Sequence, residues 1–207
     1  MFKITSNQLK LIKAFDDWNT RIVLLTGPAG SGKTMWMCKT AQKMYNKNRI
    51  DKLVITRPTV SGDEEIGFLP GSIGDKMKPW MAPIYDYIHS DDPIEIEEVP
   101  LGFMRGRTFN RTFIIADEMQ NSTNEQMKML LTRIGKDSLI GVTGDTGQSD
   151  LNQNGMDDFV DMLPDDECIL SIQHIEFDNN DIKRDNVVKD VLDVYDRRPL
   201  YPYNCLL

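Results

Sequence analysis

The residues most able to carry out chemistry form one stretch, 27–34, which reads Gly-Pro-Ala-Gly-Ser-Gly-Lys-Thr. It follows the apolar run 22–25 and precedes a predicted helix over 34–46. In the pattern G-x-x-x-x-G-K-[ST], glycines let the backbone fold back on itself, so that successive N–H groups and the positive end of the next helix point at phosphate oxygens. The stretch therefore predicts a nucleotide-binding loop of the Walker A type rather than an ordinary glycine-rich turn.

Individual positions of this loop have expected roles. Gly27 and Gly32 should take backbone angles that a Cβ atom disfavours. Lys33 should reach the β- and γ-phosphates and assist catalysis, and the Thr34 hydroxyl should hold Mg²⁺. The residues expected to bind the nucleotide are Gly27, Pro28, Ala29, Gly30, Ser31, Gly32, Lys33 and Thr34.

Two carboxylates follow a second apolar run. Residues 113–116 read Phe-Ile-Ile-Ala, which is typical of a buried parallel strand, and Asp117 and Glu118 come directly after them. There Asp117 would hold Mg²⁺, directly or through water, and Glu118 would orient and deprotonate an attacking water. A strand that ends in Asp-Glu is common by itself, but downstream of a phosphate loop it predicts hydrolysis of a nucleotide rather than binding alone.

Two polar residues at other predicted strand ends are further candidates for this site. Gln148 comes shortly after strand 139–143 and can sense a γ-phosphate and help to hold the water, unless it belongs to an ordinary polar turn. Arg57 follows strand 53–56, and charge at a strand end tends to face the ligand in open α/β sheets. We therefore expect Arg57 to contribute to nucleotide binding and Gln148 to catalysis.

Gln8 and Arg184 each have two interpretations. Gln8 lies three residues after Thr5 and would complete the capping box of a helix over 6–17, or its carboxamide would pair with adenine. Arg184 lies near the start of a predicted helix over 181–196. It would stabilise transition-state charge on a phosphate, in its own subunit or a neighbouring one, or it would be an ordinary surface residue.

Length and composition suit a single α/β domain, with 207 residues of which 40% are hydrophobic. We expect a P-loop ATPase domain over 1–198 and a tail over 199–207. The net charge of −8 is uneven, since residues 1–60 carry 11 Lys or Arg against 3 Asp or Glu, whereas residues 61–207 carry 13 against 29. This excludes a uniformly basic nucleic-acid binder and leaves a local basic face possible.

Basic and aromatic residues alternate over 101–111, where Arg105, Arg107 and Arg111 are interleaved with Phe103 and Phe109. Such a segment can bind single-stranded nucleic acid through phosphate contacts and base stacking. The alternative is that the aromatic residues, Phe109 above all, belong to the core.

The chain has no run of eighteen apolar residues, and its first ten residues lack the hydrophobic region of a signal peptide. We therefore expect no membrane association and a cytoplasmic location. The cysteines at positions 38, 168 and 205 are widely spaced and odd in number, so we expect reduced thiols.

Taken together, these motifs resemble the PhoH family of ATPases, which are similar to a single recA-type core of a superfamily-one helicase. The matching stretches run in order over roughly 5–196, and two of them are more specific than the phosphate loop. They are Gly-Phe-Leu-Pro-Gly at 67–71 and Asp-Glu-Met-Gln-Asn at 117–121.

The resemblance implies binding and hydrolysis of ATP with Mg²⁺ on a recA-like P-loop NTPase fold, an α/β architecture whose mainly parallel sheet carries helices on both faces. It also implies a ring-like homo-oligomer, such as a hexamer, that works on RNA or single-stranded DNA. Compact members are typical of phages, in which case the location would be the host cytoplasm. The second arginine of the family's C-terminal pattern is Asp190 here, so Arg184 is the surviving candidate for an arginine finger.

Two other classes of function stay open. A small P-loop kinase is disfavoured because the Asp-Glu strand end and the Gly-Asp-Thr-Gly-Gln turn at 144–148 suit water as the acceptor. A nucleotide-gated interaction protein would instead use residues 150–207, with 14 Asp or Glu against 5 Lys or Arg, to bind a basic partner.

Overall fold

The computed structural model of the chain describes residues 4–58, 84–88, 94–149, 154–164 and 169–182, together with residues 187 and 194. The stretch 67–71, Arg184 and nearly all of the helix expected over 181–196 lie outside these described residues.

One parallel sheet organises the described residues. Its strands are ordered β3-β2-β4-β5-β1-β6, and every pair of neighbours runs parallel. The strands are β1 Ile22–Thr26, β2 Lys52–Thr56, β3 Glu95–Glu98, β4 Thr112–Ala116, β5 Leu139–Gly144 and β6 Ile172–Glu176.

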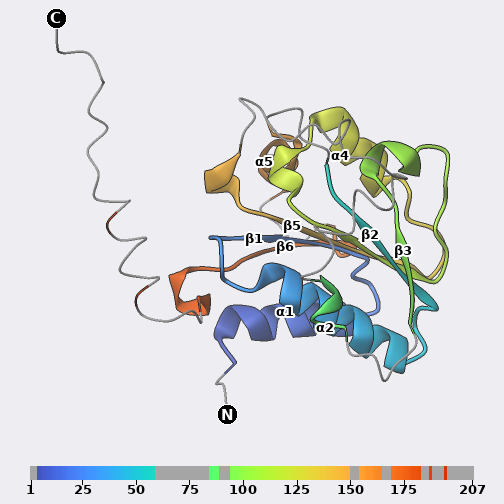
Figure 1. The fold of residues 1–207 in the computed structure, drawn as a ribbon, viewed down its shortest axis with the longest axis horizontal. Coiled ribbons are helices and arrows are strands. Elements are labelled where there is room, and N and C mark those ends of the chain that lie inside the picture. The colour runs from blue at the N-terminus through green and yellow to red at the C-terminus, as the bar shows by residue number, and fades with distance from the viewer. Residues whose placement is uncertain are drawn as a thin grey trace, which may run out of the picture.

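Helices cover both faces of this sheet (Figure 1). On one face lie α1 Ser6–Asp16 and α2 Lys33–Asn46, and on the other lie α4 Asn124–Leu131 and α5 Gly155–Asp161. Short 3₁₀ helices are η2 Leu101–Met104, η3 Met119–Asn121, η4 Thr146–Gln148 and η5 Asn179–Asp181. The expected α/β fold with a parallel sheet and helices on both faces is confirmed.

The apolar runs in the sequence occupy the centre of the sheet. Strands β1, β4 and β5 are buried along their whole length, and β2 is buried after its first residue, because helices pack on both of their faces. Phe15 of α1 packs against Phe113 of β4 with ring centroids 5.1 Å apart. A second cluster, which includes Leu130 and Met156, fills the space between the sheet and the α4–α5 layer.

Strands β3 and β6 lie at the two edges of the sheet. Edge strand β3 is acidic, since three of its four residues are glutamates. Its charge is tolerated because Lys52 Nζ and Arg107 Nη2 form ion pairs with Glu97 at 2.8 and 2.7 Å. The other edge strand, β6, begins at Ile172 and is only partly buried.

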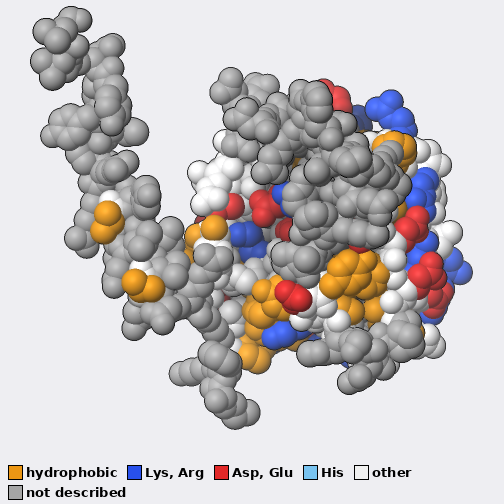
Figure 2. Space-filling model, in the orientation of Figure 1, with side chains coloured by type: hydrophobic (Ala, Val, Ile, Leu, Met, Phe, Trp, Pro, Cys, Tyr) orange, Lys and Arg blue, Asp and Glu red, His pale blue; other side chains and the backbone are white. Residues whose placement is uncertain are grey.

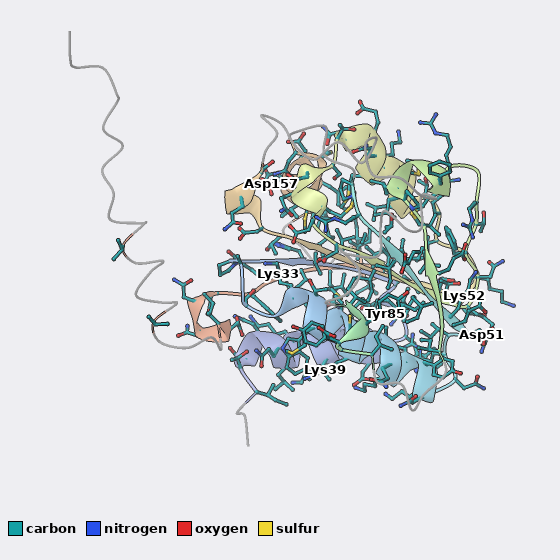
Figure 3. All side chains as sticks on the ribbon, viewed as in Figure 1. Lys33, Lys39, Asp51, Lys52, Tyr85 and Asp157 are labelled. Atoms are coloured by element: carbon teal, nitrogen blue, oxygen red, sulfur yellow. The ribbon has the colours of Figure 1, made fainter. Side chains whose placement is uncertain are left out.

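Parallel pairing brings the carboxyl ends of all strands to one edge of the sheet. Lys33 lies toward this edge, whereas Asp51 and Lys52, at the start of β2, lie at the opposite edge (Figure 3). The loops that follow β1, β2, β4 and β5 therefore meet at one place.

Cys38 is a fully buried free thiol in α2, and burial is the main reason why its pKa rises to about 12. The other two cysteines lie outside the described part of the chain. Within the described residues, no helix combines the length and the apolar character needed to cross a membrane.

We predict that Phe113→Ala lowers the free energy of unfolding by about 3–5 kcal/mol, because it opens a cavity in the core beside Phe15. Urea denaturation measures the change. Phe103→Ala is the matched control, because Phe103 is 62% exposed and should cost little. Equal destabilisation by the two substitutions would contradict the packing described here.

Candidate nucleotide-binding site

The phosphate-binding loop takes the backbone geometry that its glycines allow. Gly27, Gly30 and Gly32 have φ angles of 140°, 81° and 85°. Gly32 is the left-handed N-cap of α2, and Lys33 is the first residue of that helix. The loop thus connects the end of β1 directly to the N-terminus of α2. Such an arrangement is typical of phosphate-binding sites.

Gly27 is also required by close packing. A Cβ atom at this position would lie 2.4 Å from the carbonyl oxygen of Phe177. Phe177 follows β6, and its N–H donates to Thr26 O at 2.8 Å, so β6 continues alongside the start of the loop. The first glycine of the motif therefore satisfies both a backbone conformation and a contact with a strand far away in the sequence.

Lys33 is held inside the loop. Its ammonium group donates to the carbonyl oxygens of Gly27 at 2.6 Å and Pro28 at 3.0 Å. Burial lowers its pKa, while the nearby charges of Asp145 and Glu118 act in the opposite direction. Lys33 thus lies at the start of α2, close to the carboxylates of Asp145, Glu118 and Asp117.

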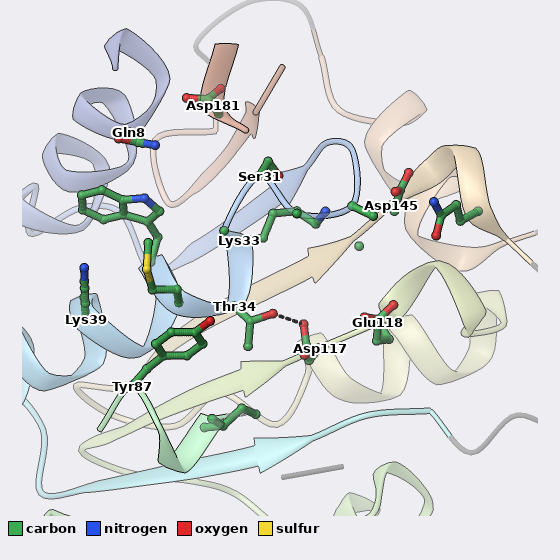
Figure 4. Close-up of a pocket in the computed structure, with 18 of the residues that line it drawn as sticks. Gln8, Ser31, Lys33, Thr34, Lys39, Tyr87, Asp117, Glu118, Asp145 and Asp181 are labelled. Carbon is green, nitrogen blue, oxygen red and sulfur yellow. Dashed lines mark hydrogen bonds between the residues drawn. The ribbon is translucent and has the colours of Figure 1, made fainter. Parts of the chain in front are cut away.

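Thr34 and Asp117 contact each other at the carboxyl end of β4. Thr34 Oγ1 donates to Asp117 Oδ1 at 3.0 Å (Figure 4), and Thr143 Oγ1 donates to the same carboxylate oxygen. Burial and the neighbouring charge of Glu118 raise the pKa of Asp117, whereas the two hydroxyl donors and Arg57 oppose that rise. A hydroxyl beside a carboxylate fits Mg²⁺, which takes oxygen ligands and keeps sites open for water and phosphate.

Glu118 has an unusual backbone. Its φ and ψ of 56° and 36° are left-handed, which is uncommon for a residue other than glycine and often accompanies function. Its Oε2 accepts a hydrogen bond from Gln120 Nε2 at 2.7 Å, and Gln120 Oε1 accepts one from Asp145 N at 3.2 Å. Gln120 is buried and so connects Glu118 to the loop after β5.

This role of Gln120 was not predicted from the sequence. The available signal was the glutamine of the Asp-Glu-Met-Gln-Asn stretch, which contributes above only to the family resemblance. Asp145 and Thr143 were also not singled out as individual site residues, although both follow or belong to strand β5.

The phosphate loop, Asp117, Glu118 and Asp145 line one cavity of about 850 Å³. In Figure 4, Gln8 and Asp181 lie on the α1 side, whereas Asp117 and Glu118 lie on the side of β4. Of the residues expected from the sequence, those that line it are Gln8, Ala29, Gly30, Ser31, Gly32, Lys33, Thr34, Arg57, Asp117, Glu118 and Gln148. Lining residues not expected include Ile4, Met35, Trp36, Lys39, Ile84, Tyr87, Asp145 and Asp181.

Gln8 forms the expected capping box. Thr5 N donates to Gln8 Oε1, and Gln8 N donates to Thr5 Oγ1, both at 3.2 Å. Gln8 is also buried and lines the cavity. The capping interpretation is thus confirmed, and contact of Gln8 with an adenine base stays a prediction.

Comparison with known proteins identifies the family, since the sequence profile described as PhoH-like protein matches residues 2–196. The chain belongs to the PhoH-like protein family. It is 39% identical over 206 residues to a PhoH-like protein of Mycobacterium tuberculosis, a match that covers 93% of this chain and 57% of the relative. It is 34% identical over 205 residues to Protein PhoH of Escherichia coli, covering 91% and 56%.

This chain thus spans somewhat more than half the length of these relatives. Among solved structures, it is similar to the large terminase of a thermophilic bacteriophage, with a TM-score of 0.55 and 11% identity, over 93% of this chain and 50% of that one. The likeness concerns the fold, which is that of an α/β P-loop NTPase.

We predict that Gly27→Ala lowers the free energy of unfolding by about 2 kcal/mol or more, because the new Cβ would strain a residue at φ 140° and press on Phe177. The same variant should lose nucleotide affinity. Urea denaturation and a nucleotide titration measure the two effects.

The matched control is Gly102→Ala, where an added Cβ has no heavy atom within 4 Å. If Gly27→Ala unfolds at the same urea concentration as this control, the proposed packing of the loop against Phe177 is wrong.

Proposed function

We propose that this chain binds ATP together with Mg²⁺ and hydrolyses it, and that hydrolysis is coupled to RNA or single-stranded DNA in a homo-oligomer. One observation carries the catalytic part of the proposal. A single cavity is lined by Lys33 of the phosphate loop, by Thr34 bonded to Asp117, and by Glu118. This is the set of groups that phosphoryl transfer to water requires.

Each charged group has a proposed task. Lys33 would neutralise the β- and γ-phosphates, with the backbone N–H groups of 29–34 around them. Thr34 and Asp117 would hold Mg²⁺, which neutralises charge on the phosphate oxygens when bound. Arg57 lines the same cavity and would add a further positive charge beside the nucleotide.

Glu118 is the proposed general base. The hydrogen bond from Gln120 orients its carboxylate. Orientation matters because the water must attack in line with the bond that breaks. Gln148 is exposed at the rim of the cavity, where it would help to hold this water.

An oligomer is part of the proposal because one recA-like core does not form a two-lobed cleft by itself. A neighbouring subunit would then close the nucleotide site and offer Arg184 to the developing charge. Membership of the PhoH-like family and the exposed residues Phe103 and Arg105 within 101–111 support the coupling to nucleic acid.

We predict that Lys33→Ala abolishes nucleotide binding and hydrolysis, whereas Glu118→Gln keeps binding but lowers the rate of ATP hydrolysis about 10²–10⁴-fold. Phosphate release and equilibrium titration with a fluorescent ATP analogue measure the two effects. Removal of Mg²⁺ with EDTA should stop hydrolysis by the wild type.

Lys10→Ala is the control, because Lys10 is exposed and lies outside the cavity. A wild-type rate for Glu118→Gln would exclude Glu118 as the base. A phosphorylated small molecule as product would instead indicate a kinase.

We further predict that Lys33→Ala and Arg184→Ala subunits, each inactive alone, regain part of the ATPase activity when they are mixed. Some interfaces would then combine an intact phosphate loop with an intact arginine from the neighbour. Activity is measured across a series of mixing ratios, with light scattering to verify that the oligomers form. No recovery at any ratio in verified mixed oligomers would argue against a shared site.

A further inference from the structure

The segment after β3, which contains η2, exposes the side chains of Phe103 and Arg105 to solvent. Leu101 and Met104 of η2 are buried, whereas Phe103 is 62% exposed and Arg105 is exposed. The alternation arises because one side of this turn packs under α4 while the other faces solvent. Phe103 is thus a large apolar ring that folding leaves uncovered within the described structure.

Backbone contacts fix the shape of this segment. Phe103 N donates to Pro100 O at 2.8 Å, and Arg107 N donates to Met104 O at 3.1 Å. Arg133, just after α4, donates from Nη1 to Arg107 O at 3.2 Å. Phe103 is therefore held in place by its neighbours in the chain.

The structure divides the basic and aromatic residues of 101–111 into two groups. Arg107 pairs with Glu97 at 2.7 Å and lies 4.6 Å from the ring centroid of Phe109, which is itself buried. Arg111 pairs with Asp51 at 2.7 Å. Arg107, Phe109 and Arg111 therefore stabilise the fold.

Phe103 and Arg105 form the second group. Within the described part of the chain, Arg105 makes no ion pair and no hydrogen bond through its side chain. Its charge is consequently available to a ligand at this surface.

Two contacting segments, 101–111 and 128–136, are basic although the whole chain is acidic. Residues 101–111 and 128–136 contain no Asp or Glu, and their basic residues are Arg105, Arg107, Arg111, Lys128, Arg133 and Lys136. Glu97 and Asp51 offset part of this charge through Arg107 and Arg111. Figure 2 shows Lys and Arg atoms beside an exposed hydrophobic group over the corner where η2 meets α4. Such local charge complements a phosphate backbone.

We propose that Phe103 and Arg105 form a contact site for single-stranded nucleic acid. A base would stack on the ring of Phe103, and Arg105 would pair with an adjacent phosphate. The proposal rests on the nucleic-acid coupling proposed above, and it locates that contact on the α4 face of the sheet, opposite the helices α1 and α2.

The site is connected to the nucleotide cavity through the fold. Glu118 leads through η3 directly into α4, and α4 packs on η2. A shift of Glu118 would therefore move η3 and α4, and through α4 it would move η2 and the proposed contact site. We expect nucleic acid bound there to alter the rate of hydrolysis without any residue of the site touching ATP.

The test is fluorescence anisotropy with labelled single-stranded RNA and DNA, using wild type, Phe103→Ala, Phe103→Trp and Arg105→Gln. Phe103→Ala should weaken binding about fivefold or more, and Phe103→Trp should retain it. Arg105→Gln should also weaken binding and reduce the slope of log affinity against log salt by about one. Phe103→Ala and Arg105→Gln should keep the basal ATPase rate and lose stimulation by nucleic acid.

Trp18→Ala is the matched control, since Trp18 is 75% exposed and has the Arg49 guanidinium 4.2 Å from its ring centroid, elsewhere on the surface. It should bind as the wild type does. Wild-type affinity for Phe103→Ala, or a changed oligomeric state on size-exclusion chromatography in place of weakened binding, would overturn the proposal. If the wild type hydrolyses ATP but binds neither polymer, this site and the proposed coupling both fail while the ATPase activity stands.

Discussion

The contact between Thr34 and Asp117 is the interaction on which the candidate site depends. It joins the first turn of α2 to the end of β4, two parts of the chain separated by more than eighty residues. The contact exists because β1 and β4 both pair in parallel with β5, so their carboxyl ends reach the same edge. Thr143 of β5 donates to the same carboxylate, so one side chain links the end of β4, strand β5 and the first turn of α2.

The buried residue Gln120 connects the loop after β4 to the loop after β5 by further hydrogen bonds. Its amide donates to Glu118 and its oxygen accepts from Asp145, so it holds the base candidate against the loop after β5. Gly144 makes room for it, because a Cβ there would lie 3.0 Å from Gln120 Oε1 and 2.4 Å from Met156 Sδ. The left-handed conformation of Glu118 is consequently supported by packing that also positions α4 and α5.

A second set of hydrogen bonds joins the start of α1 to the turn η5. Asp181 accepts hydrogen bonds from Thr5 Oγ1 and from Asn7 Nδ2, the latter at 3.0 Å, and it is buried while lining the cavity. The cap of α1 and the turn η5 therefore meet beside the candidate nucleotide cavity. Arg184, the candidate arginine finger, comes three residues after Asp181 in the sequence and lies outside the described residues.

The sequence by itself determined the phosphate loop, the Asp-Glu strand end and the buried central strands, because glycine spacing and continuous apolar runs are local consequences of backbone sterics and burial. It also predicted the α1 capping box, since Thr5 and Gln8 are close neighbours in the chain. Only the tertiary structure decided that acidic residues 95–98 form an edge strand, that Gln120 orients Glu118, and that Arg107 is paired while Phe103 is exposed. Each of these depends on which distant groups come into contact, and contact follows from strand order and packing rather than from residue type.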